Sequence, residues 1–381
     1  MENSYIILTD KNRKLDMISG KLLPMSLELV PVEIIEVFGL DLCDIVSIQR
    51  TSRHMYEMIK ERVPRIFPLV TFRKGMESWI RGLMNVKLER LKDLSVFSRV
   101  YSLNLSGIGV EDVSALGHIH TLDLSYTQVK DVSALGKVHT LNLCHTEVED
   151  VNALGNVHTL NLSYTEVEDV SALSRVHTLN LSFTRVEDAS LLGNVHTLNL
   201  SCSCVTNISN LDRVYDLNLY CTGIRDVSHL GNVHTLDLSC TLVNDVSALG
   251  KVHTLSLART NIQGVSYLEQ VHTLNLSCSN VIDVSSLGKV HTLDLSCTQV
   301  EDVSALGKVH TLDLSGSRVV DVSALGQVHA LNLSYTNVED VSALGRVFIL
   351  NLFNTKVKDI SALDKVQWLN IEYDLEHFSH W

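Results

Sequence analysis

A stretch of nineteen residues recurs along most of this chain and constrains its fold more than any other feature. Residues 120–138 read HTLDLSYTQVKDVSALGKV, residues 139–157 read HTLNLCHTEVEDVNALGNV, and the pattern continues without insertion or deletion. A weaker copy occupies residues 82–100 in the same register. A fixed period near 20 residues is typical of solenoids, in which each turn packs only on its neighbours. The marker column of the repeat reads Tyr101, His120, His139, His158, His177, His196, Tyr215, His234, His253, His272, His291, His310, His329, Phe348 and Gln367.

Each copy contains a strand pattern followed by a turn pattern. The alternation around Leu141 and Leu143 predicts a strand with one buried face. In DVNALG, Asp150 is placed to cap a short 3₁₀ turn that Gly155 closes. The segment VHTLNLCHTEV matches the leucine-rich-repeat pattern, so residues 82–373 resemble a leucine-rich-repeat protein. We therefore predict an α/β solenoid, a leucine-rich-repeat array of parallel strands with short 3₁₀ or irregular convex turns, preceded by a small helical head. The expected core positions of one turn are Val138, Leu141, Leu143, Val148, Val151 and Leu154.

Charge and proline divide the chain into two parts. Residues 1–99 carry 16 Lys and Arg against 13 Asp and Glu, whereas the remainder carries 15 against 31. All four prolines, Pro24, Pro31, Pro64 and Pro68, lie in the first part. An acidic solenoid without a stripe of Arg and Lys is a poor nucleic-acid binder, so we expect no nucleic-acid partner. The predicted organisation is an N-terminal segment (1–62), a linker with a degenerate capping repeat (63–100), the repeats (101–366) and a C-terminal cap (367–381).

Composition favours a reducing compartment. The N-terminus MENSYIILTDKNRK lacks the apolar region of a signal peptide, and no run of eighteen apolar residues exists. We expect no membrane partner. Eight cysteines without a secretory signal indicate free thiols and a cytoplasmic location. A chain of 381 residues with 45% hydrophobic residues can bury a core without disulfides or metal, and we expect a monomer outside a complex.

The N-terminal segment has three apolar stripes at helical spacing, in about residues 28–62. Val30-Pro31-Val32-Glu33-Ile34 and the section from Asp44 to Arg53 resemble the two conserved parts of an F-box. The resemblance implies docking on the small Skp-type adaptor of a cullin ubiquitin ligase, with the repeats holding the substrate. The alternative is that the head is only an N-terminal cap on the first repeat. By resemblance, the residues that form or support the docking surface are Pro31, Ile34, Ile35, Phe38, Ile45 and Ile48. Near-identical repeats behind such a head also resemble proteins encoded by giant DNA viruses, which implies a host cytoplasm.

The sequence contains no motif for catalysis. It has no phosphate-binding loop, no G-x-S-x-G and no H-E-x-x-H. Catalysis needs one asymmetric group of residues in a pocket, whereas a periodic rod repeats the same groups in every turn. We expect no catalytic residue, no metal site and no cofactor.

Two columns of chemically active residues have structural explanations. Eleven histidines repeat at about the strand spacing; we interpret them as flank residues copied with the repeat, and a ladder of metal-bridging imidazoles is the alternative. The aspartates at position 131 and its equivalents are placed to cap the N–H groups of their own turns. A calcium ladder, the alternative for this column, would need glycine-rich loops that these turns lack.

One position varies while the rest of the repeat is monotonous. It lies two residues after the L-x-L pair and reads Gly107, Tyr126, His145, Tyr164, Phe183, Cys202, Cys221, Cys240, Arg259, Cys278, Cys297, Gly316, Tyr335 and Asn354. Repeat proteins place specificity beside the concave strand face, and aromatic side chains are typical anchors. Tyr126, His145, Tyr164 and Phe183 are therefore candidate residues of a partner-binding rim, with packing at the rim as the alternative. The uniform Thr and Asn columns of the strand face leave a third possibility, a periodic ligand such as a polysaccharide or ice.

Overall fold

The computed structural model describes residues 70–72, 94–97, 100–262 and 264–371. The F-box-like residues lie outside these ranges, so the helical head remains a prediction. The chain divides into two compact units at the bond between Thr146 and Glu147. In the described part, no helix has the length and apolar character needed to span a bilayer.

The first unit starts the parallel ladder. Strands β2 (Val100–Asn104), β3 (Thr121–Asp123) and β4 (Thr140–Asn142) pair in parallel. Strand β1 (Val70–Phe72) pairs antiparallel with β2. It lies in the segment expected to hold only a linker and a degenerate repeat, and the sequence analysis does not predict it. The 3₁₀ turns of this unit are η4 (Leu94–Phe97), η5 (Ser114–Leu116) and η6 (Ser133–Leu135).

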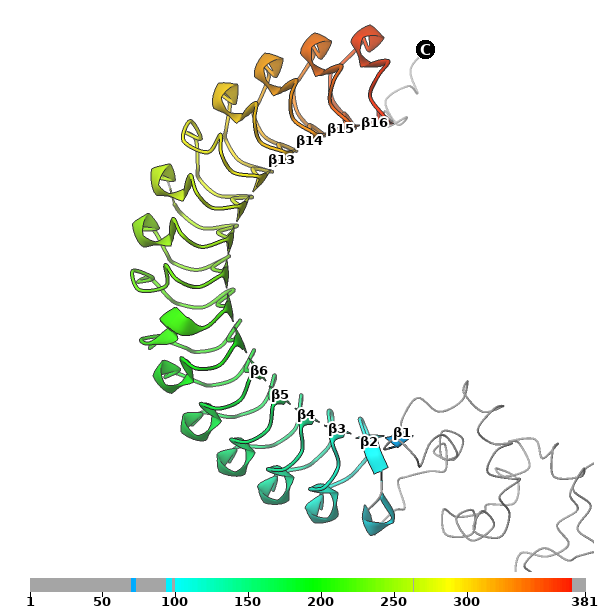
Figure 1. Cartoon of the computed structure of the whole chain (residues 1–381), viewed down its shortest axis with the longest axis vertical. Coiled ribbons are helices and arrows are strands. Elements are labelled where there is room, and N and C mark those ends of the chain that lie inside the picture. The colour runs from blue at the N-terminus through cyan, green and yellow to red at the C-terminus, as the bar shows by residue number, and fades with distance from the viewer. Residues whose placement is uncertain (1–69, 73–93, 98–99, 263, 372–381) are drawn as a thin grey trace, which may run out of the picture. The chain divides into compact units, whose positions relative to one another are not determined.

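The second unit continues with one strand per turn. Each strand pairs in parallel with the strand nineteen residues later, as Leu255 does with Leu274. In this unit the strands follow the inner edge of an arc and the 3₁₀ turns its outer edge (Figure 1). The strands are β5 (Thr159–Asn161), β6 (Thr178–Asn180), β7 (Thr197–Asn199), β8 (Asp216–Asn218), β9 (Thr235–Asp237), β10 (Thr254–Ser256), β11 (Thr273–Asn275), β12 (Thr292–Asp294), β13 (Thr311–Asp313), β14 (Ala330–Asn332), β15 (Ile349–Asn351) and β16 (Trp368–Asn370). The 3₁₀ turns are η7 (Asn152–Leu154), η8 (Ser171–Leu173), η9 (Ser190–Leu192), η10 (Leu211–Arg213), η11 (Ser247–Leu249), η12 (Ser266–Leu268), η13 (Ser304–Leu306), η14 (Ser323–Leu325), η15 (Ser342–Leu344) and η16 (Ser361–Leu363).

The core is a column of aliphatic side chains. In one turn of the second unit Val157, Leu160, Leu162, Val167, Val170 and Leu173 are all at most 3% exposed. Burying each such side chain stabilises the fold by roughly 1.5–3 kcal/mol, which lets a turn without disulfides hold its shape. The predicted leucine-rich-repeat solenoid, with parallel strands and 3₁₀ turns, is confirmed.

Asp side chains cap the outer turns as predicted. Each of the twelve Asp residues in the column accepts a hydrogen bond from the backbone N–H two residues on, at 2.8–2.9 Å. Asn207 replaces Asp in one turn and accepts the N–H of Ser209 at 3.2 Å. These bonds satisfy a donor at the start of each turn that would otherwise lack a partner.

Strand β16 (Trp368–Asn370) is the last strand that the structure describes. Trp368 on β16 is 69% exposed. Residues 372–381, which make up most of the predicted C-terminal cap and include Phe378 and Trp381, lie outside the described residues. The cap over residues 367–381 therefore stays a prediction.

Candidate partner-binding surface

The variable position lies in a tight turn where each strand leaves the sheet. Ser163 donates its N–H to Asn161 Oδ1 at 3.0 Å, and Thr165 Oγ1 donates to the Leu162 carbonyl at 2.6 Å. Between them the N–H of Tyr164 donates to the Ser182 carbonyl of the next turn at 3.0 Å. These three bonds hold Tyr164 with a φ of 58°, in the left-handed region.

Every residue of the variable column shares this backbone conformation. The twelve residues other than glycine have φ between 53° and 59°, and Gly107 and Gly316 have φ of 72° and 65°. A left-handed backbone costs an L-residue with a β-carbon roughly 1–2 kcal/mol. This constraint was not predicted from the sequence, although glycine at two turns and Asn354 at a third indicate it. Side chains other than glycine therefore occupy the column at a cost in backbone energy.

The left-handed position gives a test of that cost. Arg259 is exposed at a φ of 56°, so Arg259→Gly should raise the free energy of unfolding by about 1 kcal/mol. Lys251→Gly is the control, because Lys251 is exposed and has no positive φ; it should lower that free energy by about 0.5–1 kcal/mol. Urea unfolding measures both, and a destabilised Arg259→Gly variant would contradict the explanation.

The aromatic residues of this column stack in pairs on the surface. In the first unit, the Tyr126 and His145 rings lie 4.6 Å apart at 16°; in the second, Tyr164 and Phe183 lie 4.2 Å apart at 9°. Tyr126, Tyr164 and Phe183 are 62%, 45% and 46% exposed, and His145 is exposed as well. The four predicted rim residues thus form one exposed aromatic pair in each unit. Stacking pre-orders the rings, so a partner would lose little side-chain entropy on contact.

The histidine column forms a second, longer stack of rings. In the second unit, eleven rings from His158 to Phe348 lie face to face at 4.6–4.9 Å, apart from a 4.4 Å step between Tyr215 and His234. Tyr and Phe replace His in this column because any flat ring can stack there. No group of three or more His, Cys, Asp or Glu side chains in the described part of the chain could hold a metal ion. Ring stacking, which the sequence analysis did not foresee, gives the column a structural role.

Stacking changes the proton affinity of the imidazoles. Desolvation lowers the pKa of His177 below its ordinary value, and the charges of His158 and His196 lower it further. The pKa of His291 is lowered in the same way, by desolvation and then by its two neighbours in the stack. A proton on one ring therefore costs more in the fold than in the unfolded chain.

Acid should destabilise the repeats in a window set by these histidines. Their folded pKa lies below the unfolded value of about 6.5, so the unfolded chain binds more protons as the pH falls through this range. The stabilisation is complete above the unfolded pKa and is lost as the pH falls toward the folded pKa. The hydrogen bond from Ser304 N–H lowers the pKa of Asp302 below its ordinary value of 3.8, so this capping aspartate adds a loss of stability only at a pH below about 3.8. The urea midpoint of the wild type should decrease as the pH is lowered from 7.5 to 5.5, and that of the double variant His177→Gln, His291→Gln should decrease less. An equal decrease of the two midpoints with pH would contradict the explanation.

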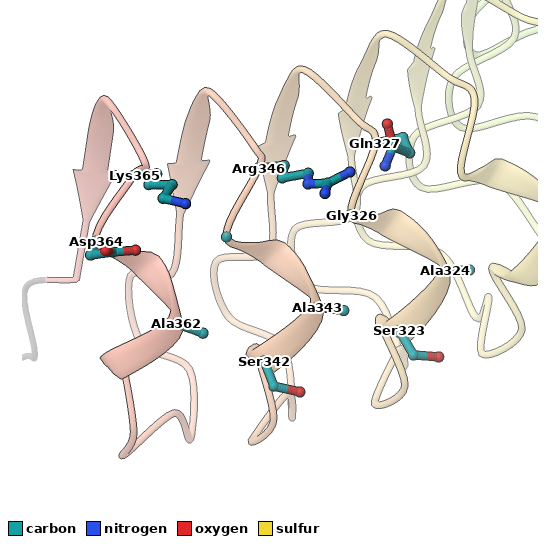
Figure 2. Close-up of a pocket in the computed structure, with 11 residues that line it drawn as sticks. Ser323, Ala324, Gly326, Gln327, Ser342, Ala343, Arg346, Ala362, Asp364 and Lys365 are labelled. Carbon is teal, nitrogen blue, oxygen red and sulfur yellow. The ribbon is translucent and has the colours of Figure 1, made fainter.

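A shallow groove lies on the outer edge of the second unit. It has a volume of about 440 Å³ and follows the 3₁₀ turns η14 to η16 (Figure 2). Its lining is mostly the Ser, Ala and Gly of successive turns, with Gln327, Arg346 and Lys365 on the neighbouring column and Asp364 as the one carboxylate among the lining residues. The groove reflects the spacing between outer turns.

Comparisons with known proteins agree on the fold. No protein-family model matches the sequence, and no curated protein sequence matches it significantly. A leucine-rich-repeat protein of Leptospira interrogans superposes with a TM-score of 0.60 at 16% identity, covering 74% of this chain and 86% of that one. An internalin of Listeria monocytogenes gives a TM-score of 0.54 at 19% identity, covering 71% and 86%. The ectodomain of the Arabidopsis thaliana receptor kinase GASSHO1/SCHENGEN3 gives 0.52 at 21%, covering 72% and 42%. The chain therefore has the leucine-rich-repeat fold.

Proposed function

We propose that this chain is a non-catalytic binding scaffold whose exposed aromatic pairs contact a protein partner. The observation that carries the proposal is the pair Tyr164 and Phe183, stacked at 4.2 Å and about half exposed. Aromatic side chains are the commonest energetic anchors of protein interfaces, and here they keep a left-handed backbone that glycine would adopt without strain. The Arabidopsis receptor ectodomain was solved in complex with CASPARIAN STRIP INTEGRITY FACTOR 2, which supports a binding role for the fold.

A second, more specific proposal concerns the machinery to which the scaffold presents its partner. We propose that residues 28–62 dock on a Skp-type adaptor through Pro31, Ile34, Ile35, Phe38, Ile45 and Ile48, and that the repeats present their partner to a cullin ubiquitin ligase. The cytoplasm, of a host cell if the chain is viral, would supply this machinery. In the alternative, the head only caps the first repeat. A flat periodic ligand such as ice is disfavoured in the second unit, because its strands follow the inner edge of an arc (Figure 1).

The rim proposal is tested by removing the aromatic pair. The double variant Tyr164→Ala, Phe183→Ala should weaken binding of proteins recovered with the full chain by about 10- to 100-fold, the loss of one strong anchor. Tyr267→Ala is the matched control, since Tyr267 is 62% exposed but lies on the outer turn η12. Quantitative pull-down with each variant measures the effect; equal recovery by the double variant and the wild type would exclude this rim as the binding surface.

The adaptor proposal is tested separately with a purified Skp-type adaptor. Ile34→Ala and Phe38→Ala should each weaken its binding to the full chain while the unfolding midpoint of the repeats stays unchanged. If no adaptor binds and both variants lower the midpoint, the head is a cap.

A further inference from the structure

Cysteines fill the variable column in two runs of neighbouring turns. Cys202, Cys221 and Cys240 stand in three consecutive turns, and Cys278 and Cys297 in two more. All five are free thiols, and each is exposed or half-buried, so solutes can reach them. The binding surface proposed above makes no use of them.

The backbone holds these thiols at a fixed spacing. Each cysteine has φ between 54° and 58° and donates its N–H to a carbonyl of the next turn at 2.7–2.9 Å. Ring centroids in the same column lie 4.2–4.6 Å apart, which measures the separation of side chains in adjacent turns. The Cys297 sulfur lies 3.3 Å from the position of a β-carbon on Gly316, on the side away from Cys278. Side-chain hydrogen bonds nevertheless link the thiols of Cys297 and Cys278, and those of Cys202 and Cys221.

We propose that the pairs Cys202–Cys221 and Cys278–Cys297 each bind one thiophilic d¹⁰ cation, such as monovalent copper, in two-coordinate geometry between their sulfur atoms. Thiolates select soft cations of this kind. With metal–sulfur bonds of about 2.3 Å, as in zinc thiolates, two sulfurs on opposite sides of the ion lie about 4.6 Å apart. That distance matches the spacing of the column.

Other products of these thiols are less favoured. A disulfide tolerates β-carbons about 3.5–4.5 Å apart, a range that the column spacing partly overlaps, but its formation needs an oxidant, which the reducing cytoplasm proposed above does not supply. A structural zinc ion needs four ligands, and no group of three or more His, Cys, Asp or Glu side chains that could hold a metal exists among the described residues. Two cysteine sulfurs can supply all the ligands of a two-coordinate cation, but not those of a four-coordinate one.

Binding exchanges protons for the metal. Each thiol releases its proton to solvent as its sulfur–metal bond forms, so two thiols and one monovalent cation give a complex of charge −1 and two protons. Desolvation and the neighbouring thiol raise the pKa of Cys202 and of Cys297, and Asp294 and Asp313 raise that of Cys297 further. Binding should therefore strengthen as the pH rises.

Titration of the reduced full chain with cuprous ion tests the proposal. The ion is supplied as a coloured bicinchoninate complex without oxygen, and the loss of colour counts the ions that the protein takes. The wild type should take two equivalents. Cys278→Ser should remove one, and so should Cys221→Ser, because Cys202 and Cys240 are then two turns, about 9 Å, apart. Cys202→Ser should keep both, because Cys221 can pair with Cys240.

Two controls make the result decisive. Cys204→Ser should keep both equivalents, because Cys204 is exposed and lies outside the column. The thermal midpoint of each metal-free variant should match that of the wild type, so that a loss of binding is not a loss of fold. The proposal is overturned if Cys221→Ser and Cys202→Ser bind the same number of ions, or if Cys204→Ser loses one.

Discussion

Leu274→Ala should lower the free energy of unfolding by about 2–5 kcal/mol, the usual cost of a cavity left by a buried leucine. Leu274 lies on β11, is 1% exposed and pairs in register with Leu255 and Leu293 on the strands to either side. Because a solenoid turn contacts only its neighbours, the other turns cannot move in to fill the space. Urea unfolding followed by circular dichroism measures the loss.

A matched leucine on the surface isolates the effect of burial. Leu242 lies in the same unit and is 51% exposed, so Leu242→Ala should change the free energy of unfolding by no more than about 0.5 kcal/mol. If the two variants unfold at the same urea concentration, the leucine column does not hold the array together. A transition that splits into two steps in Leu274→Ala would instead show the array unfolding on either side of the weakened turn.

Gly307→Ala should destabilise the protein by about 1–3 kcal/mol, although its backbone conformation predicts the opposite. Gly307 follows η13 with φ −60° and ψ −11°, an ordinary helical conformation. Alanine adopts this conformation freely and normally stabilises a protein by restricting the unfolded chain. Here the added β-carbon would meet the carbonyl oxygen of Ala324 in the next outer turn. The steric contact decides the sign of the effect.

The control for this glycine is one with open space around it. No atom lies within 4 Å of a β-carbon built on Gly223, so Gly223→Ala should be neutral or stabilise by about 0.4–1 kcal/mol. Ser174, Asp212, Glu269 and Asp364 occupy the position of Gly307 in other turns, which shows that the ladder can admit a side chain and limits the cost. Stabilisation of Gly307→Ala in calorimetry would mean that the turns separate freely.

The sequence predicts those parts of the structure that depend on one turn alone. Strands, buried leucines and capping aspartates follow from the nineteen residues of any copy, because apolar spacing and Asx hydrogen bonds are local. Contacts between copies are harder to foresee: the ring stack through His177 and the steric need for Gly307 arise only when turns lie at a known separation. Strand β1 lies outside the repeat pattern, so the periodicity of the sequence could not predict it. The left-handed backbone of the variable column, as at Tyr164, could not be predicted from residue type, because aromatic residues and cysteine rarely adopt this conformation.

For the candidate site, the sequence located the column but not its geometry. Variation at one position of the repeat marked Tyr126, His145, Tyr164 and Phe183 as rim residues, and the structure shows that they are exposed and stacked in pairs. The binding of a partner to these residues depends on the chemistry of both surfaces, which the spacing of residues in the sequence does not predict. The F-box-like residues lie outside the described ranges, so their role rests on the resemblance.

The in-register pairing of the strands has a genetic consequence. Since Leu255 faces Leu274 and Leu274 faces Leu293, loss of one complete nineteen-residue copy would bring Leu255 opposite Leu293 with every core position still aligned. A chain that lost or gained one whole copy would keep the same register of its strands and the same pattern of hydrogen bonds between them. What changes is the order of side chains along the variable column. A change in the number of copies would therefore lengthen or shorten the exposed variable column without requiring a new core.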